Sequence, residues 1–262
     1  MIHGLHNHYL YSAKKIISTW SDGTNTVELR GTGFILRKND DFILVTNRHV
    51  VEPVYYAAKY AGYKVTCFQI ESFESFDASG LPQNMNSASI SNWSDFVFHP
   101  NQYNDIACLK NPKTIGGDFT INAPIEISML ATAEWINQKL VVCDTIAYPG
   151  FPEWYDRLNN TPIFRMGTIA SDPRLNYSYN PSAPVSDRIA YEGFSTGGAS
   201  GSPVFAIQRG FRTGKGLTAS DDFFREVKII GINAGHYPDQ ATHSGISYLY
   251  KSSAILDITD TM

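Results

Sequence analysis

Three residues whose types can together perform acyl transfer occur along this chain in the order His49, Asp105, Ser200. A serine hydroxyl becomes a nucleophile when a histidine takes its proton and a carboxylate orients that histidine. Each residue alone also has a structural interpretation. His49 follows an apolar strand-like run, and Asp105 begins another, as a turn or cap residue would. Their combination in one chain predicts a hydrolytic site.

The surroundings of Ser200 strengthen this prediction. Residues 197–203 read Gly-Gly-Ala-Ser-Gly-Ser-Pro. Glycine tolerates positive φ and close approach of other atoms, and proline cannot donate a ladder hydrogen bond. We therefore expect Ser200 on a tight loop, with its hydroxyl exposed and backbone N–H groups nearby. The alternative is an ordinary Gly/Ser turn. An α/β-hydrolase elbow is disfavoured because position 202 is Ser instead of Gly and the triad order differs.

The elements that must position these residues are expected to be strands. Short β-rich runs alternate with Gly, Pro, Asn and Asp, which is typical of an all-β sandwich or barrel. We predict two antiparallel six-stranded β-barrels, residues 1–115 with His49 and Asp105 and residues 116–262 with Ser200, and a site in the cleft between them. Residues 72–94 are expected to form a long surface loop. The expected strands are 16–20, 26–30, 34–36, 42–46, 63–70, 106–110, 140–147, 164–170, 188–191, 204–207, 227–232 and 246–250, with short helices at 55–60, 132–139 and 252–258, the last capped by Ser252.

Composition excludes several other classes. The 262 residues are 43% hydrophobic and 18% charged, with a net charge of −4, which argues against a nucleic-acid partner. The chain has no apolar run of the roughly 20 residues that span a membrane, and its N-terminus lacks a signal-peptide pattern.

Three cysteines with strand-like flanks predict buried free thiols and a reducing, cytoplasmic location. Three histidines near the N-terminus are not expected to bind metal, and no cofactor is expected. The cysteines are Cys67, Cys108 and Cys143, and the histidines are His3, His6 and His8.

Several motifs resemble those of chymotrypsin-like serine peptidases. The family's histidine motif is matched at 46–50, its aspartate motif at 98–110, and its serine motif at 198–203. Residues 31–34 are similar to the small-residue turn before the strand that faces the histidine loop, and 146–150 look like a segment frequent in bacterial members. The matching residues read Thr-Asn-Arg-His-Val, Phe-His-Pro…Asn-Asp-Ile-Ala-Cys-Leu-Lys, Gly-Ala-Ser-Gly-Ser-Pro, Gly-Thr-Gly-Phe and Ile-Ala-Tyr-Pro-Gly.

The resemblance implies a double-barrel fold with a short C-terminal helix, and it implies roles for the site residues. Ser200 would attack a peptide carbonyl, His49 would transfer the proton, and Asp105 would orient His49. The N–H groups of Gly198 and Ser200 would bind the oxyanion. The substrate would be a polypeptide. Its specificity pocket would be lined by Phe194, Ser195, Thr196, Ala234, Gly235, His236 and Gly245.

Two departures from the family pattern affect the expected regulation. Ala199 stands where classical secreted members carry an Asp that pairs with a new N-terminus, so activation by N-terminal cleavage is not expected. Ser202 stands where Gly is usual. The alternatives are a catalytically silent peptide-binding module and a signalling or immune effector peptidase switched on by a protein partner.

Substrate preference is less readable from the sequence. No acidic residue stands at the position of Phe194, which disfavours cleavage after Lys or Arg. His236, Asn233 and Ser195 could bind a polar or acidic side chain, but we expect His236 to lie on the rim of the pocket.

Overall fold

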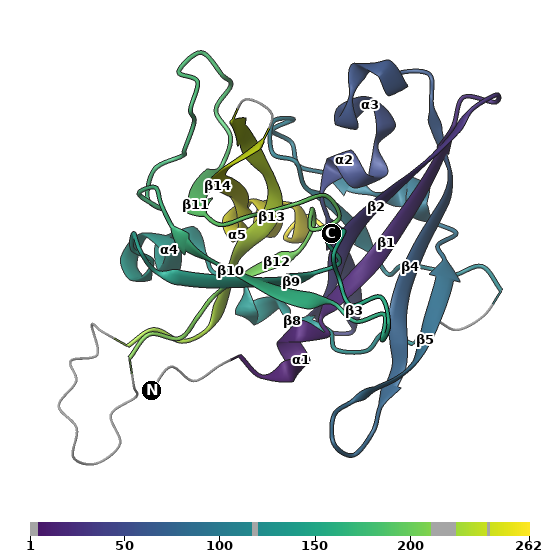
Figure 1. Ribbon diagram of the computed structural model, residues 1–262, viewed down its shortest axis with the longest axis horizontal. Coiled ribbons are helices and arrows are strands. Elements are labelled where there is room, and N and C mark those ends of the chain that lie inside the picture. Colours follow the sequence, from purple (N-terminus) through teal and green to yellow (C-terminus); the bar gives the residue numbers. More distant parts are fainter. Residues whose placement is uncertain (1–4, 117–119, 211–223, 240–241) are drawn as a thin grey trace.

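The computed structural model describes residues 5–116, 120–210, 224–239 and 242–262. Within these ranges the chain forms two β-rich halves that lie side by side, as predicted from the spacing of strand and turn residues (Figure 1). The first half, coloured purple to blue, forms one sheet. The second half, coloured green to yellow, forms a closed barrel. The predicted all-β class is therefore confirmed.

The described part of the first half is an eight-stranded sheet in the order β5-β4-β1-β2-β3-β7-β6, with β8 parallel to β2. Its strand pairing does not close into the predicted six-stranded barrel. The division of the chain at residue 115 stays a prediction, although β8 follows that residue and pairs with the first sheet. The strands are β1 (Ala13–Ser21), β2 (Thr26–Lys38), β3 (Asp41–Thr46), β4 (Lys64–Phe76), β5 (Pro82–Ser89), β6 (Val97–Phe98), β7 (Ala107–Lys110) and β8 (Ile125–Glu126).

The predicted surface loop at 72–94 is wrong over most of its length. β4 continues to Phe76, and β5 returns antiparallel to it from Pro82 to Ser89. β5 is an edge strand, so it pairs on one side alone and most of its side chains remain partly or fully exposed. Polar Ser and Asn residues suit such a position, and they hide the apolar alternation by which a buried strand is recognised.

Strand β2 runs without a break through the glycines at which the sequence predicted two separate strands. A Cβ atom on Gly31 would lie 2.9 Å from the Val50 side chain and 3.4 Å from the Ser200 carbonyl oxygen. Glycine at this position therefore lets the helical turn after His49 and the Ser200 loop approach the strand. The small residues of β2 therefore allow the segments of the site to pack closely against this strand.

The second half is the predicted barrel of six strands, closed in the order β10-β11-β14-β13-β12-β9. Its first strand begins at Thr145, five residues later than expected, and Val141 and Val142 are exposed. The strands are β9 (Thr145–Gly150), β10 (Ile163–Ile169), β11 (Arg188–Glu192), β12 (Pro203–Ala206), β13 (Lys228–Asp239) and β14 (Thr242–Lys251).

The cysteines are free, but the expectation that all three are buried is wrong. Cys108 in β7 is buried, Cys67 in β4 is half-buried, and Cys143 is exposed. Cys143 lies in the turn before β9 with φ of 64°, because the run that we expected to be a strand starts as a turn. Strand-like flanking residues therefore do not by themselves predict burial.

Five α-helices occur in the described residues: α1 (Asn7–Leu10), α2 (Arg48–Val51), α3 (Pro53–Tyr56), α4 (Ala133–Lys139) and α5 (Ser252–Thr259). The N-cap of α5 is Lys251, not Ser252 as expected, because the Ser252 hydroxyl donates to the Ala131 carbonyl at 2.6 Å. None of the described helices has the length and apolar character needed to cross a membrane.

A shared apolar core joins the two halves. It contains buried side chains of the first sheet, of the barrel and of α5. This core holds the end of β3, which precedes His49, close to the start of β12, which follows Ser200. Its buried members include Phe34, Val45, Ile106, Phe205, Ile232, Ala254 and Ile258.

Candidate active site

His49 and Asp105 form a contact within the first half of the chain. The Asp105 Oδ2 atom lies 2.5 Å from His49 Nδ1, and Oδ1 accepts a hydrogen bond from the His49 backbone N–H at 2.8 Å. Buried Asn47 donates to the Asp105 carbonyl at 2.7 Å, which ties the two segments together. Because the carboxylate holds Nδ1–H, Nε2 is the ring nitrogen left to accept a proton.

Two tyrosines of β14 lie within electrostatic reach of Asp105. Burial, together with the negative charge of Asp105, raises the pKa of Tyr248 to about 12 and raises the pKa of Tyr250 further. The Arg188 guanidinium lies over both rings, with its carbon 4.7 Å and 5.1 Å from their centroids, and donates to the Tyr250 hydroxyl at 2.7 Å. These tyrosines therefore remain protonated at neutral pH and do not compete with His49 for a proton.

Ser200 lies on the tight loop that its neighbours predicted. Its hydroxyl donates to the carbonyl of Ala234 at 3.2 Å. Among the described residues, His49 Nε2 has no hydrogen-bond partner. The serine hydroxyl must therefore rotate away from Ala234 before it can donate to His49.

Gly198 has the backbone conformation that its position requires. Its φ is +88°, and a Cβ atom would lie 2.3 Å from the carbonyl oxygen of Phe151. Within the described ranges, the N–H groups of Gly198 and Ser200 donate to no acceptor. Two unengaged donors beside a serine hydroxyl are what an oxyanion hole requires.

The predicted pocket residues fall into two groups. Ser195 and Ala234 are buried against the Ser200 loop: Ser195 Oγ accepts from the Asn233 side chain at 2.9 Å, and Ala234 accepts from Ser200. Gly235 lies on β13, and a Cβ there would meet the Tyr248 hydroxyl at 2.9 Å.

The second group gathers around His243 of β14, which was not among the predicted pocket residues. The His243 ring stacks on His236 at 4.2 Å and lies 5.0 Å from the ring of Phe194. Its Nδ1 accepts from the backbone N–H of Gly245 at 2.8 Å. Phe194 is 61% exposed, so its side chain lies on the surface. Burial and the neighbouring His236 lower the pKa of His243.

Arg165 is a second residue that the sequence did not single out. It donates to the carbonyl oxygen of Phe194 and, at 3.2 Å, to the Thr196 hydroxyl. The carbonyl of Thr196 in turn accepts from the Ala199 N–H at 3.1 Å. Arg165 therefore stabilises the segment that leads into the Ser200 loop. No sequence signal pointed to it, because it lies on β10, outside the motifs, although it pairs with Tyr148 of the 146–150 segment.

Thr32 is the third missed residue, although it occupies the middle of the Gly-Thr-Gly segment noted above. Its hydroxyl donates to the Gly198 carbonyl at 2.7 Å and accepts from the Phe151 N–H at 3.1 Å. Its own N–H donates to the Ser200 carbonyl at 2.8 Å. One buried side chain of the first sheet thus contacts the loop of the second half.

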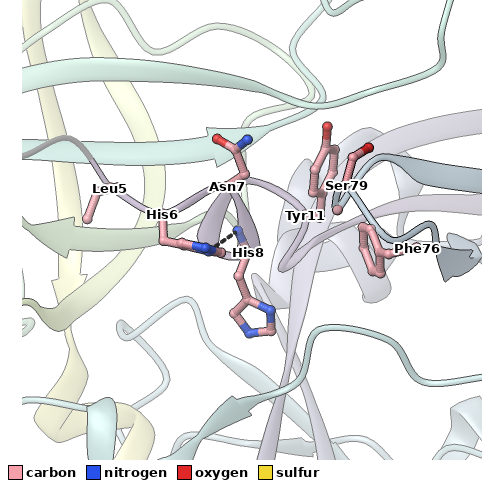
Figure 2. A pocket seen from close by; sticks show the side chains of 8 residues that line it. Leu5, His6, Asn7, His8, Tyr11, Phe76 and Ser79 are labelled. Carbon is pink, nitrogen blue, oxygen red and sulfur yellow. Dashed lines mark hydrogen bonds between the residues drawn. The ribbon is translucent and has the colours of Figure 1, made fainter.

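A separate pocket of about 450 Å³ lies near α1. Figure 2 shows His6, whose Nδ1 accepts from the His8 backbone N–H at 3.1 Å, with Tyr11 and Phe76 on the other side of the view. His3 lies outside the described residues. None of the predicted catalytic or substrate-binding residues lines this pocket. In the described part of the chain, no group of three or more His, Cys, Asp or Glu side chains is arranged to hold a metal ion.

The fold is similar to that of a solved peptidase. The crystal structure of the Rv3671c protease from M. tuberculosis, in its active form, matches with a TM-score of 0.53 at 15% sequence identity. The match covers 95% of this chain and 79% of that one. At this identity the likeness shows a shared fold. No curated protein matches the sequence.

The sequence also matches a family model described as the trypsin-like peptidase domain, over residues 31–212. This range is more than half of the chain, and it includes His49, Asp105 and Ser200. The chain belongs to the trypsin-like peptidase domain family.

Proposed function

We propose that this protein is a serine endopeptidase that uses His49, Asp105 and Ser200. The observation that carries the proposal is the double contact of Asp105 with the ring and the backbone of His49, at 2.5 Å and 2.8 Å. A surface ion pair has no need of both contacts, whereas a catalytic base needs its tautomer and its orientation fixed. The unengaged N–H groups of Gly198 and Ser200 supply the complementary anion site.

The reaction follows from these positions. Ser200 Oγ rotates from Ala234 towards His49 Nε2, gives up its proton to that nitrogen and attacks the peptide carbonyl. The oxyanion that forms accepts from Gly198 and Ser200 N–H, and Asp105 stabilises the protonated ring of His49. His49 then protonates the leaving amine, and an acyl-enzyme remains on Ser200. Water, deprotonated by His49, hydrolyses this ester and restores the serine.

We also propose that the uncleaved chain is active, because Ala199 offers no carboxylate that could pair with an N-terminus freed by cleavage. The contact of Ser200 with Ala234 is compatible with a resting arrangement that substrate or a protein partner would change. An activating partner therefore stays a prediction. A cytoplasmic location also belongs to the proposal, on the basis of three free cysteines.

A fluorophosphonate probe, which phosphonylates activated serines, tests the proposal. We expect one probe per chain on the wild type, no labelling of Ser200→Ala, and strongly slowed labelling of His49→Ala. Intact-mass measurement should find the label on the full-length chain. Absence of labelling in the wild type, with casein cleavage also absent, would contradict the proposal and favour a silent peptide-binding module.

A further inference from the structure

We propose that Asn233 is a positioning residue that aims the Ser200 N–H at the oxyanion, through an uncharged contact with the Ala199 carbonyl. This inference rests on the proposed function and adds Asn233 to the residues that prepare the site. It explains how the Ser200 loop is ordered when Ala199 precedes the serine. The loop must be ordered by something other than a carboxylate at that position, because alanine offers none.

The side chain of Asn233 contacts the segment on the N-terminal side of the nucleophile. Its Nδ2 donates to the Ala199 carbonyl at 2.8 Å and to the Ser195 hydroxyl at 2.9 Å. Its Oδ1 accepts from the Tyr191 hydroxyl at 2.6 Å. A carbonyl oxygen can only accept, so the amide nitrogen must face Ala199. The contact with Tyr191 then selects this orientation of the amide.

The backbone of Asn233 contacts the other side of the loop. Its carbonyl accepts from the Gly201 N–H at 2.9 Å, and its N–H donates to the Ser202 carbonyl at 2.9 Å. Asn233 is fully buried and lies on β13, inside the closed barrel. A single residue of a rigid strand therefore contacts the loop before and after Ser200.

Peptide geometry connects this contact to the chemistry. The peptide bonds of the described chain are all trans, and in a trans peptide the C=O and the following N–H point in opposite directions. The Ala199 carbonyl and the Ser200 N–H belong to one peptide unit. When Asn233 binds that carbonyl on the buried side, the Ser200 N–H must point outwards, towards the substrate.

The Gly198 N–H, the second oxyanion donor, is oriented by the same peptide geometry, but here the partner is a backbone group. The Gly197 carbonyl, which shares a peptide unit with the Gly198 N–H, accepts from the Glu153 N–H at 3.1 Å. The intervening unit is fixed by Thr32, which donates to the Gly198 carbonyl at 2.7 Å. The Ala199 carbonyl also accepts from the Ser202 N–H at 3.2 Å, so Asn233 is the side chain that orients the Ser200 donor, together with one backbone group.

The groups that face Asn233 are uncharged. Tyr191 lies on β11 and Ser195 on the loop that follows it, and Tyr148 of β9 packs on Tyr191 with ring centroids 5.6 Å apart. Burial raises the pKa of Tyr191 well above its ordinary value, and burial also raises the pKa of Tyr148. In the wild type the contact consequently does not titrate in the neutral range. An ionisable group placed at position 233 would therefore introduce a new pH dependence.

The test is Asn233→Asp, followed by the rate of fluorophosphonate labelling between pH 6 and pH 9. The ionised carboxylate cannot donate to the Ala199 carbonyl, whereas the protonated acid can. At pH 8 we expect labelling to slow by about 100-fold, the effect of losing one oxyanion donor. The ratio of variant to wild-type rate should rise as the pH falls, because the buried acid becomes protonated. Asn233→Ala should be slow with a ratio that does not change with pH.

Asn122→Asp is the control, since the Asn122 amide also donates to the backbone, at 2.6 Å to each of the Phe73 and Glu74 carbonyls. It should label at the wild-type rate throughout. If Asn233→Asp does not fold, Tyr191→Phe is tested instead. We expect slower labelling of this variant, and its melting temperature is measured on the same samples. Wild-type rates in a folded position-233 variant, or in Tyr191→Phe, would overturn the inference. An unlabelled wild type would instead contradict the proposed function.

Discussion

The two halves of the molecule prepare their parts of the site by different physical means. In the first half, His49 is fixed by a charged group, since both oxygens of Asp105 contact it. In the second half, Ser200 is surrounded by neutral contacts, from Thr32 and from Asn233. In the proposed mechanism, proton transfer thus relies on a local charge, and the nucleophile relies on the geometry of peptide units.

This difference determines which substitutions should disturb the site in each half. An orienting carboxylate acts on its partner directly, so replacing it changes the chemistry of the base while the backbone stays in place. A loop ordered through glycine conformations and carbonyl contacts fails when one atom is added or one donor removed. The two halves also differ in their buried charges. Arg225 in the second half is paired with the Asp144 carboxylate, whereas Lys14 in the sheet is buried with no carboxylate beside it in the described residues.

The largest expected effect is on the charged side. Asp105→Asn retains the shape of the side chain but presents an amide to His49, which favours the wrong tautomer. We expect turnover to fall by about 10⁴-fold with an unchanged melting temperature. Steady-state cleavage of casein, with circular dichroism of the same samples, measures both. A loss below tenfold would mean that Asp105 does not orient the base.

The buried charge of the barrel should contribute most to stability. Asp144 contacts Arg225, whose side chain is 1% exposed, and it also contacts Arg209 at 3.1 Å. Asp144→Asn leaves the buried guanidinium without its counter-charge, which costs about 3–5 kcal/mol of unfolding free energy. Urea denaturation measures this change. The control is Asp172→Asn, which removes a surface partner of Arg174 and should change stability little.

The glycines of the nucleophile loop test its dependence on geometry. Gly198→Ala adds a Cβ that would lie 2.3 Å from the Phe151 carbonyl, at a φ of +88°. We expect fluorophosphonate labelling to slow by about 100- to 1000-fold, because the Gly198 donor is displaced. Gly197→Ala is the matched control, since nothing lies within 4 Å of its Cβ. Equal rates for the two variants would remove Gly198 from the oxyanion site.

The effect of Lys14, which has no carboxylate partner among the described residues, depends on pH and is the smallest for a change of one pH unit. Lys14 donates to the Tyr11 and Asn122 carbonyls, and burial lowers its pKa from 10.5 to about 7. Between these two values the unfolded chain binds a proton that the folded chain does not. Stability should therefore rise with pH, by about 1.4 kcal/mol per unit, from pH 7 towards pH 10.

Lys14→Met removes the titrating group and should remove this rise. Urea denaturation of the wild type and the variant at several pH values measures the two slopes. Identical slopes would show that Lys14 is ionised in the folded protein, and the contrast between the two halves in buried charge would then disappear.

Local sequence predicted the parts of the fold whose cause is local. Proline, glycine and Asp-Gly turns limited the strands, and Thr132 marked the start of α4, where its hydroxyl accepts from the Trp135 N–H at 3.1 Å. The β4–β5 hairpin was missed because an exposed edge strand carries no apolar alternation. The position of Cys143 was missed because an apolar run in a turn has the same composition as one in a strand.

Sequence by itself determined which groups could do the chemistry and which backbone positions needed glycine. His49, Asp105, Ser200 and Gly198 could be named because their residue types and near neighbours carry the signal. Tertiary structure alone decided which distant groups order them. The partners of the Ser200 loop, Thr32 and Asn233, come from strands far along the chain in either direction, and only the packing of sheet against barrel brings their hydrogen-bonding groups to its carbonyls.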